Sequence, residues 1–360
     1  MVTIRDVARL AGVSTATVSQ ALNGRGRVDV RTRERVAQAA TKLRYAPNLS
    51  GRRLARRRAE CVAVVQGRNM TTVFNDSFYR VVLGGMAEVT QARGYSLVFT
   101  PPPAAAATDA DLVRMLGHGA VDGALVLGAV DAGLLLALRH RELPVVLVDN
   151  FLPGVDLPAV IPDYQAGARL ATEHLLRLGH RRVALLGAAV SYPFGWRTLD
   201  GYVEALATRD ILHDPALVRR TEIGVETATE ATRSLLALPD PPTALFAVTD
   251  AMAIGALRAA RERGVRVPER LAVVGMDDIE MSAYTDPPLT TVRVAKDAMG
   301  RLAAEWLIGM IEGSAPARPV PSMPAELIVR ATCGGTPAGR VPTASVIPAA
   351  IPTIVTTEGA

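Results

Sequence analysis

The sequence predicts a multidomain chain, with a small all-α head followed by a two-lobed α/β core built on parallel sheets. Short, capped helical patterns fill the first 46 residues. From Cys61 onward, short runs of Val, Leu and Ile alternate with longer amphipathic patterns, in two rounds near 61–160 and 162–288. Because a strand that is apolar throughout is buried on both faces, this alternation indicates parallel sheets covered by helices on both sides.

The head is expected to contain three helices and a short fourth one. Thr3 and Ser14 are suitable caps for the first two, and the sequence around Gly12 separates them. Pro47 stops the helical pattern before Asn48 caps the fourth. The expected helices run over 4–10, 15–22, 31–43 and 48–54.

The core is expected to alternate strands and helices up to a C-terminal tail. The expected strands are 62–65, 96–99, 123–127, 145–148, 183–186, 244–248 and 271–274. The expected helices are 78–93, 165–178, 199–209, 227–238, 251–263 and 296–312. Residues 332–360 are rich in Pro, Thr, Ala and Gly, which predicts a disordered tail.

Composition narrows the function class. The 360 residues suffice for two or three domains, and no apolar run is long enough to cross a bilayer. No signal peptide precedes the head, and Cys61 and Cys333 do not form a spaced set, so we expect free thiols in a reducing cytoplasm. The five histidines lack metal-ligand spacing, and we expect no metal, no cofactor and no membrane partner.

Charge is distributed unevenly along the chain. Residues 1–58 hold fourteen basic and three acidic side chains, a formal net charge of +11, against +5 for the whole chain, so that the rest carries −6. A basic head on a mildly acidic body is typical of a nucleic-acid binder. A solvated cationic face without a partner is the alternative.

The segment 6–22 fits a helix-turn-helix. Ala8, Gly12, Val18 and Leu22 supply the small contact residue, the turn glycine and the inward apolar side chains that this geometry requires. The outward side chains of the second helix are short and polar, as a helix lying in a major groove needs, and Gln20 has the amide that pairs with an adenine edge. A purely structural helical pair is the alternative, which the basic charge disfavours. The outward residues are Thr15, Ala16, Thr17, Ser19 and Gln20.

These segments resemble a known family. Residues 3–8 (TIRDVA), 15–23 (TATVSQALN), 32–36 (TRERV) and 45–48 (YAPN) are similar to the lactose/galactose repressor (LacI/GalR) family, over about residues 2–332. The resemblance implies a transcription repressor that binds a pseudo-palindromic operator in double-stranded DNA as a homodimer. It also implies control by a small-molecule effector, sugar-like or nucleoside-like.

The resemblance implies roles for the head and its hinge. Residues at the places of Thr15, Ala16 and Gln20 read bases, and 47–55 resembles a hinge that becomes helical on the operator. Leu54 occupies the place of a leucine that wedges into the minor groove, while Gly51, where alanine is common, should weaken the isolated hinge helix by roughly 1 kcal/mol. The expected DNA-binding set is Thr15, Ala16, Thr17, Ser19, Gln20, Asn23, Asn48, Arg52, Arg53 and Leu54.

The resemblance continues through the core in 166–175 (AGARLATEHL), 178–182 (LGHRR), 264–268 (GVRVP), 274–279 (VGMDDI) and 287–292 (PPLTTV). Such cores are similar to periplasmic sugar-binding proteins, with two lobes joined by crossing strands, here expected near 160–163, 289–293 and 323–328. The expected domains are 1–46 for the helix-turn-helix head, 47–59 for the hinge and linker, 60–331 for the effector-binding and dimerisation core, and 332–360 for the tail. Within the core, the first lobe takes about 60–160 and 292–321, and the second about 161–289 and 322–331.

Candidate effector-binding residues follow the expected strands, where open α/β sheets place their ligands. Each carboxylate could instead be a helix cap or a loop ion pair, Asp250 above all, and Phe78 and Tyr79 could belong to the dimer interface or to the core of a lobe. Two departures from the family pattern leave the effector open: Thr249 replaces a usual asparagine, and Arg197 lies one position earlier than usual. The candidates are Asp76, Phe78, Tyr79, Asp149, Trp196, Arg197, Asp250 and Asp277.

Three other functions compete with a repressor. An enzyme is disfavoured because no GxGxxG, P-loop or nucleophile–histidine pattern is present. A transport-binding protein would need a signal peptide and would not need a basic head. An architectural DNA binder would bind without sequence preference and without response to metabolites.

Overall fold

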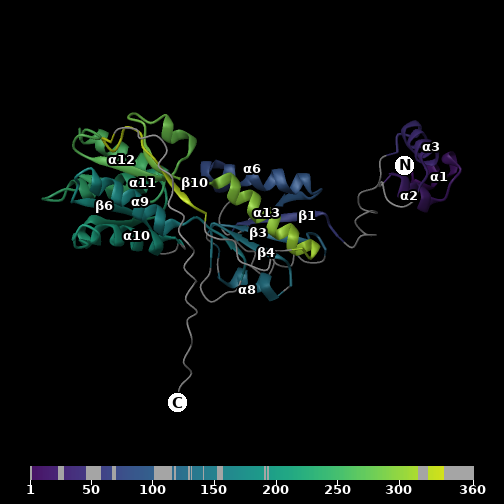
Figure 1. Ribbon diagram of the computed structural model, residues 1–360, viewed down its shortest axis with the longest axis horizontal. Helices are drawn as coiled ribbons and strands as arrows, with labels where there is room; N and C mark the ends of the chain where they lie inside the picture. Colours follow the sequence, from purple (N-terminus) through teal and green to yellow (C-terminus); the bar gives the residue numbers. More distant parts are fainter. Residues whose placement is uncertain are drawn as a thin grey trace, which may run out of the picture. The chain divides into compact units, whose positions relative to one another are not determined.

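The computed structural model describes residues 2–22, 28–45, 58–66, 70–100, 116, 119–128, 130, 132–140, 142–151, 157–189, 192, 194–314 and 323–335. The chain divides into two compact units, Met1–Ala59 and Glu60–Ala360 (Figure 1). Five residues of the expected DNA-binding set lie outside the described residues, as do the hinge at 47–55 and residues 336–360: Asn23, Asn48, Arg52, Arg53 and Leu54.

The described part of the head contains the three expected helices. Helix α1 spans Ile4–Ala11, α2 spans Thr15–Leu22 and α3 spans Val30–Lys42. The fully buried side chains of Val7, Val18 and Val36, one from each helix, meet in a small core. At the start of α1, the carboxylate of Asp6 accepts hydrogen bonds from the backbone N–H and the hydroxyl of Thr3, at 3.0 and 2.8 Å. These contacts fix the entry to the head.

The first lobe is built on a fully parallel sheet of five strands in the order β2-β1-β3-β4-β5. Helices α6 and α13 lie side by side, and α13 packs on β3, β4 and β5 (Figure 1). The strands are β1 (Cys61–Gln66), β2 (Ser96–Phe99), β3 (Gly123–Leu127), β4 (Val145–Val148) and β5 (Ala159–Val160). The helices are α5 (Met70–Asn75), α6 (Ser77–Ala92), α8 (Ala132–His140) and α13 (Lys296–Glu312).

The second lobe is built on a six-stranded sheet in the order β11-β10-β9-β8-β6-β7. Helix α9 packs on this sheet and on α10, while α11 packs on α12. The strands are β6 (Val183–Ala188), β7 (Val218–Thr221), β8 (Ala244–Ala247), β9 (Ala272–Asp277), β10 (Thr290–Val294) and β11 (Ala325–Ile328). The helices are α9 (Tyr164–Arg177), α10 (Gly195–Ala207), α11 (Val225–Leu236), α12 (Asp250–Glu262) and the 3₁₀ turns η1 (Pro215–Leu217) and η2 (Glu280–Ala283).

The predicted alternation of buried strands and helices is confirmed, with one difference in direction. Strand β11 is antiparallel to β10, whereas the other pairs of both sheets are parallel. The reason is connectivity: the chain leaves the second sheet along β10, forms α13 in the first lobe, and returns along β11 in the opposite direction.

The chain passes between the two sheets at three places: at Ile161–Asp163, between β10 and α13, and between α13 and β11. The first and third passages run next to each other, because the Met323 N–H donates to the Ile161 carbonyl at 2.9 Å and the Asp163 N–H donates to the Met323 carbonyl at 3.0 Å. The lobes are therefore connected by adjacent, hydrogen-bonded segments.

Two expected boundaries need correction. Strand β10 pairs with β9 and β11 up to Val294, so the first-lobe segment expected from 292 begins later. The tail expected from Thr332 also begins too early, because Thr332 and Cys333 are buried in the second lobe. The Thr332 hydroxyl donates to the Val273 carbonyl at 2.7 Å and accepts from the Thr290 N–H at 2.8 Å, which ties this segment to β9 and β10.

Helices α6 and α13 approach each other at two glycines. A Cβ built at Gly85 would overlap the backbone carbonyl of Asp297, and one built at Gly300 would overlap the backbone carbonyl of Val82. Neither obstacle is a flexible side chain, so neither position has room for a larger residue. The two helices therefore pack backbone against backbone, which couples them as one rigid pair.

Adjacent glycines on α6 provide a test of this contact. Gly84 has no atom within 4 Å of its Cβ position, so Gly84→Ala should raise the free energy of unfolding by up to about 1 kcal/mol through helix propensity. Gly85→Ala should lower it by roughly 1–3 kcal/mol, because the helices must move apart. Urea denaturation followed by circular dichroism measures both values. Equal effects of the two substitutions would contradict the close contact.

Candidate functional site

The exposed face of α2 is the first candidate site. Ser14 caps this helix: its hydroxyl accepts from the Thr17 N–H at 3.1 Å and lies 2.9 Å from the Thr17 hydroxyl. The side chains of Thr15, Ala16 and Gln20 are exposed, whereas Thr17 and Ser19 are half-buried. The exposed face of α2 is therefore narrower than the sequence predicted, because the Thr17 backbone and hydroxyl already contact the Ser14 cap.

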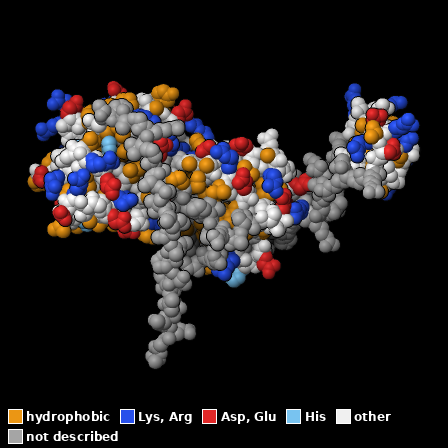
Figure 2. Space-filling model, viewed as in Figure 1, with side chains coloured by type: hydrophobic (Ala, Val, Ile, Leu, Met, Phe, Trp, Pro, Cys, Tyr) orange, Lys and Arg blue, Asp and Glu red, His pale blue; other side chains and the backbone are white. Residues whose placement is uncertain are grey.

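The turn and the surface of the head suit a helix that contacts an anionic partner. Gly12 ends α1 with φ +65°, a left-handed conformation that glycine adopts without strain. Every described lysine and arginine of the head is exposed, and Figure 2 shows blue side chains on the visible face of the head. These residues are Arg5, Arg9, Arg31, Arg33, Arg35, Lys42 and Arg44.

In the core, Asp149 is the centre of the second candidate site. It follows β4 with φ +58° and is buried. Its carboxylate accepts a hydrogen bond from the Tyr79 hydroxyl of α6 at 2.7 Å and another from the Tyr164 hydroxyl of α9. Since α6 belongs to the first lobe and α9 to the second, Asp149 joins side chains from both lobes.

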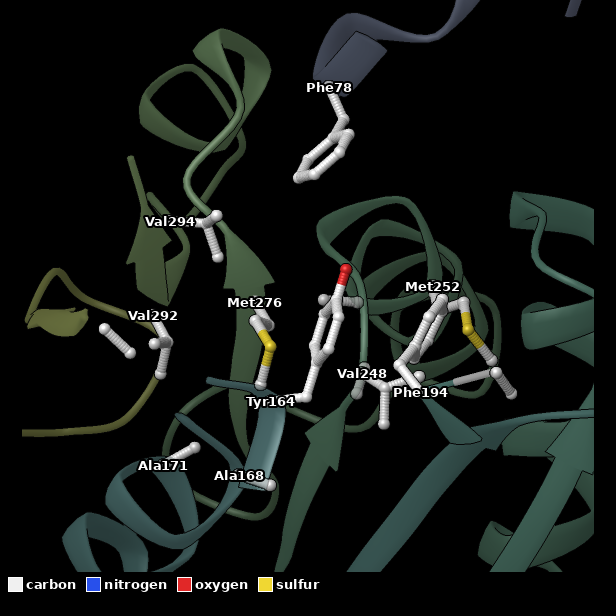
Figure 3. Close-up of a cluster of buried hydrophobic side chains, with 14 of the residues drawn as sticks. Phe78, Tyr164, Ala168, Ala171, Phe194, Val248, Met252, Met276, Val292 and Val294 are labelled. Atoms are coloured by element: carbon white, nitrogen blue, oxygen red, sulfur yellow. The ribbon is translucent and has the colours of Figure 1, made fainter. Parts of the chain in front are cut away.

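Aromatic packing holds Tyr164 in this position. Its ring stacks on Phe194 with centroids 4.7 Å apart. Figure 3 shows the Tyr164 hydroxyl pointing toward Phe78 of α6, with Met276 on one side of the ring. Phe78 itself is buried in the core cluster, so of the two adjacent aromatic candidates only Tyr79 contacts the central carboxylate.

Burial controls the protonation of Asp149. Desolvation raises its pKa from 3.8 to about 6, although the hydrogen bonds from Tyr164 and Tyr79 act in the opposite direction; the nearby carboxylate of Asp76 raises it further. Burial also raises the pKa of Asp76, whose carboxylate caps α6 by accepting from the Phe78 N–H at 2.8 Å. The two candidates thus lie close enough to influence each other.

Asp277 ends β9 of the second lobe and lies close enough to Asp149 and Asp76 to interact with them. Its backbone has φ +122°, a conformation rarely adopted by non-glycine residues. Desolvation raises the pKa of Asp277 well above its ordinary value; Asp250, Asp76 and Asp149 raise it further, while Lys296 lowers it. No described residue donates a hydrogen bond to its carboxyl group, which leaves Asp277 the carboxyl group best able to form hydrogen bonds with a ligand.

Asp250 has a different environment from the other candidates. It is fully buried, and its two oxygens accept hydrogen bonds from the Ser282 hydroxyl at 2.6 Å, the Ile279 N–H at 2.9 Å and the Thr291 hydroxyl. The cap of α12 is Thr249, which accepts from the Met252 N–H at 3.2 Å. The carboxylate of Asp250 is thus used in joining α12, η2 and β10, and it is neither the helix cap nor the loop ion pair expected as its structural alternative.

Trp196 and Arg197 form a separate aromatic and cationic cluster with Phe151. The guanidinium carbon of Arg197 lies 4.8 Å from the Phe151 ring centroid and 5.0 Å from that of Trp196. Trp196 is 46% exposed, whereas the buried Nε of Arg197 has no hydrogen-bond partner among the described residues. A flat ring beside an unpaired donor suits a ligand with an apolar face and an acceptor oxygen.

Sequence reasoning missed several residues of this region. Asn150 is 3% exposed and its Nδ2 has no hydrogen-bond partner among the described residues, so a donor is available directly after Asp149. Phe151 follows in the same loop, and the position after β4 was a signal that could have identified both. Tyr164 and Lys296 carried no local signal, because their roles depend on contacts between lobes.

Comparisons with known proteins place this geometry in a family. Residues 3–48 match the model for bacterial regulatory proteins of the lacI family, and residues 172–333 match the periplasmic binding protein-like domain. The chain is 32% identical over 339 residues to the transcriptional repressor CytR of Escherichia coli K12, an alignment that covers 93% of this chain and 97% of that protein. This chain belongs to the LacI family.

Other members support the same assignment across both units. The transcriptional regulator CelR of Thermobifida fusca is 35% identical, with 86% of this chain and 92% of that protein covered. The crystal structure of the Lac repressor dimer bound to operator and an anti-inducer has a TM-score of 0.80 at 28% identity, covering 92% of this chain and 99% of that one. A CelR–cellobiose complex has a TM-score of 0.71 at 33% identity, covering 92% and 100%.

This LacI-family member is a DNA-binding transcriptional regulator with a periplasmic-binding-protein-like sensor core. Among the described residues, no helix is both long and apolar enough to span a bilayer. No group of three or more His, Cys, Asp or Glu residues in the same part of the chain is arranged to hold a metal ion.

The raised pKa of Asp149 predicts a pH dependence of stability. Because the folded-state pKa of about 6 lies above the ordinary 3.8, the folded protein keeps this proton where the unfolded chain has lost it. The free energy of unfolding should therefore fall as the pH rises from 3.8 to about 6. Asp149→Asn should remove that component, since asparagine tolerates the same positive φ.

Urea titrations of both proteins across this pH range measure this effect. The pKa of Asp250, also raised by burial to about 6, is present in both proteins, so the difference between their slopes isolates Asp149. Parallel slopes would contradict a protonation change at Asp149.

Proposed function

We propose that this protein is a ligand-responsive transcription repressor that binds a pseudo-palindromic operator as a homodimer and is controlled by a small metabolite, a sugar or a related compound such as a nucleoside. The observation that carries the proposal is the Asp149 contact, in which tyrosines of both lobes meet one buried carboxylate. A molecule bound at this point touches both lobes and therefore favours one arrangement of them over another.

The DNA-binding half of the proposal uses the exposed face of α2. Gln20 would pair with an adenine edge in the major groove, and the methyl group of Ala16 would contact a thymine methyl. The exposed arginines of the head would neutralise phosphates, which predicts binding that weakens steeply with salt. The Lac repressor dimer bound to operator, a close match in fold, supports this arrangement.

The domain limits and the hinge complete the proposal. A head over 1–46, a hinge and linker over 47–59 and a sensor core from 60 fit the division between Ala59 and Glu60. Within the hinge, Leu54 would enter the minor groove while Arg52 and Arg53 contact phosphates. Gly51 would make folding of the hinge depend on DNA, so that an effector controls it by changing the arrangement of the lobes.

The sensor half of the proposal favours a hydroxyl-rich ligand. Asp277 and Asp149 would accept hydrogen bonds from hydroxyls, Asn150 and Arg197 would donate to ligand oxygens, and Trp196 would cover an apolar face. The relatives include CelR, solved with cellobiose, and a ribose operon repressor of Haemophilus influenzae, which supports a carbohydrate.

The proposed DNA partner also bears on the cellular compartment and on the question of enzymatic activity. Because operator DNA is the proposed partner, we place the protein in the cytoplasm, and we assign it no catalytic residue. Turnover of a metabolite by the purified protein would favour an enzyme instead.

Operator binding provides the first test. Selection from a random duplex library should yield one pseudo-palindromic sequence. Gln20→Ala should weaken binding to it by roughly 5- to 150-fold, the equivalent of the ~1–3 kcal/mol of a base contact. Gln38→Ala changes an exposed glutamine of α3 and is the matched control, expected to bind normally. Selection of no common sequence would contradict an operator.

Effector binding provides the second test. In a thermal-shift panel of mono- and disaccharides and nucleosides, at least one compound should raise Tm, by a stabilisation of about 2.7 kcal/mol at a concentration of about a hundred times Kd. Asp277→Asn should abolish the shift. The control is Asp210→Asn, an exposed aspartate of the second lobe that also has positive φ. A full shift with the Asp277 variant would exclude that carboxylate from the site.

A further inference from the structure

Lys296 is exceptional in the composition of this chain. Only two of the forty basic residues are lysines, Lys42 in the head and Lys296 in the core, and all others are arginines. Arginine therefore serves nearly every position that requires a surface cation. A lysine at a buried position indicates a requirement for a compact ammonium group with three donors, which a planar guanidinium does not provide.

The surroundings of Lys296 show such a requirement. The side chain is 7% exposed, and its Nζ donates to three backbone carbonyls, those of Asp277, Asp278 at 3.1 Å and Val294 at 3.4 Å. Each of the three donors of the ammonium thus has an acceptor. Desolvation lowers the pKa of Lys296, and the neighbouring carboxyl groups of Asp277 and Asp278 offset part of that cost of burying the charge.

The backbone that binds Lys296 has an unusual conformation. Asp277 and Asp278 are consecutive non-glycine residues with positive φ, +122° and +54°. The Asp278 carboxylate is held by Arg293 at 2.8 Å and Arg330 at 2.6 Å, so the turn is fixed from its other side as well. Two of the three carbonyls that face the ammonium, those of Asp277 and Asp278, belong to the same turn that presents Asp277 to the effector site, and the third, that of Val294, ends β10.

Lys296 connects this turn to the first lobe. It is the first residue of α13, which packs backbone against backbone with α6 at Gly85 and Gly300. Helix α6 carries Tyr79, which donates to Asp149. The ammonium thus connects the end of β9 in the second sheet to the rigid pair of helices in the first lobe.

We propose that Lys296 is a positioning residue that holds the two lobes at a fixed orientation across the effector site, by anchoring the first turn of α13 to the carbonyls of the Asp277–Asp278 turn. The inference rests on the proposed function only in treating Asp277 as an effector-site residue. Loss of the ammonium leaves three carbonyls without their donor and frees α13, with α6 attached, to move relative to β9.

Spin-label distances in the full chain test this role without DNA or effector. One label pair spans the lobes, at Gln91→Cys on α6 and Glu226→Cys on α11; a second pair lies within the second lobe, at Arg209→Cys and Glu226→Cys. All three positions are exposed, whereas the natural Cys61 and Cys333 are buried. Dilution with unlabelled protein removes distances between subunits.

Lys296→Met keeps the length of the side chain and removes its charge. It should shift and broaden the distance distribution between the lobes and leave the distribution within the second lobe unchanged. Lys42→Met, at the exposed lysine of the head, should change neither. An unchanged distribution between lobes would overturn the proposal. So would a change in both distributions, since that result would show damage to the second lobe rather than a change of orientation. If no operator or effector is found, the spin-label distances still test the role of Lys296, because they are measured without either.

Discussion

Carboxyl groups are buried where the carboxyl ends of the two sheets face each other, and the surrounding structure compensates for removing them from water. Asp149, Asp250 and Asp277 all lie at this level, and burial raises the pKa of each. A buried charge costs several kcal/mol unless it is paired, hydrogen-bonded or neutralised. Each of the three carboxyl groups meets this cost in a different way.

Asp250 is satisfied by donors of its own lobe, so it contributes to the scaffold. Asp149 takes its donors from tyrosines of both lobes, and this makes its hydrogen bonds sensitive to their relative position. Asp277 has a lysine bound to its backbone carbonyl while its carboxylate receives no hydrogen bond from a described residue. Of these three carboxyl groups, the one that no described residue bonds is therefore held by the contact that also connects the lobes.

This arrangement suits a regulator better than a rigid binding protein. A ligand shifts an equilibrium only by the difference in its affinity for two states. A ligand that contacts Asp149 and Asp277 has such a difference, because these residues belong to different lobes. The head, in contrast, presents short, exposed side chains on a capped helix. Such a helix can contact the surface of a partner without surrounding it.

The sequence predicted what local patterns determine. Helix α13 was placed at its observed limits, 296–312, and Ser14 was identified as the cap of α2. Strand β7 was missed because its sequence, VRRT, is only half-buried at the edge of the sheet and lacks the apolar run of an interior strand. The N-cap of α12 is Thr249, whereas the sequence suggested Asp250 one position later, because threonine and aspartate are both suitable N-cap residues.

The remaining features depend on long-range contacts. Tyr164 lies one residue before the helix expected over 165–178, and its role arises from its contact with Asp149, which follows a strand of the other sheet. The carbonyls around Lys296 come from the end of β9, the turn after it and the end of β10, and no spacing in the sequence predicts that they converge. Such contacts follow from the packing of the two lobes, which only the folded structure specifies.

Coupling between the two binding events tests the central claim most directly. The affinity of the protein for its selected operator should be measured with and without the compound that raises Tm, and the affinity for that compound with and without the operator. The account predicts that both affinities change by the same factor, roughly 5- to 150-fold for a coupling of ~1–3 kcal/mol. An operator affinity that is unchanged at saturating compound would contradict it.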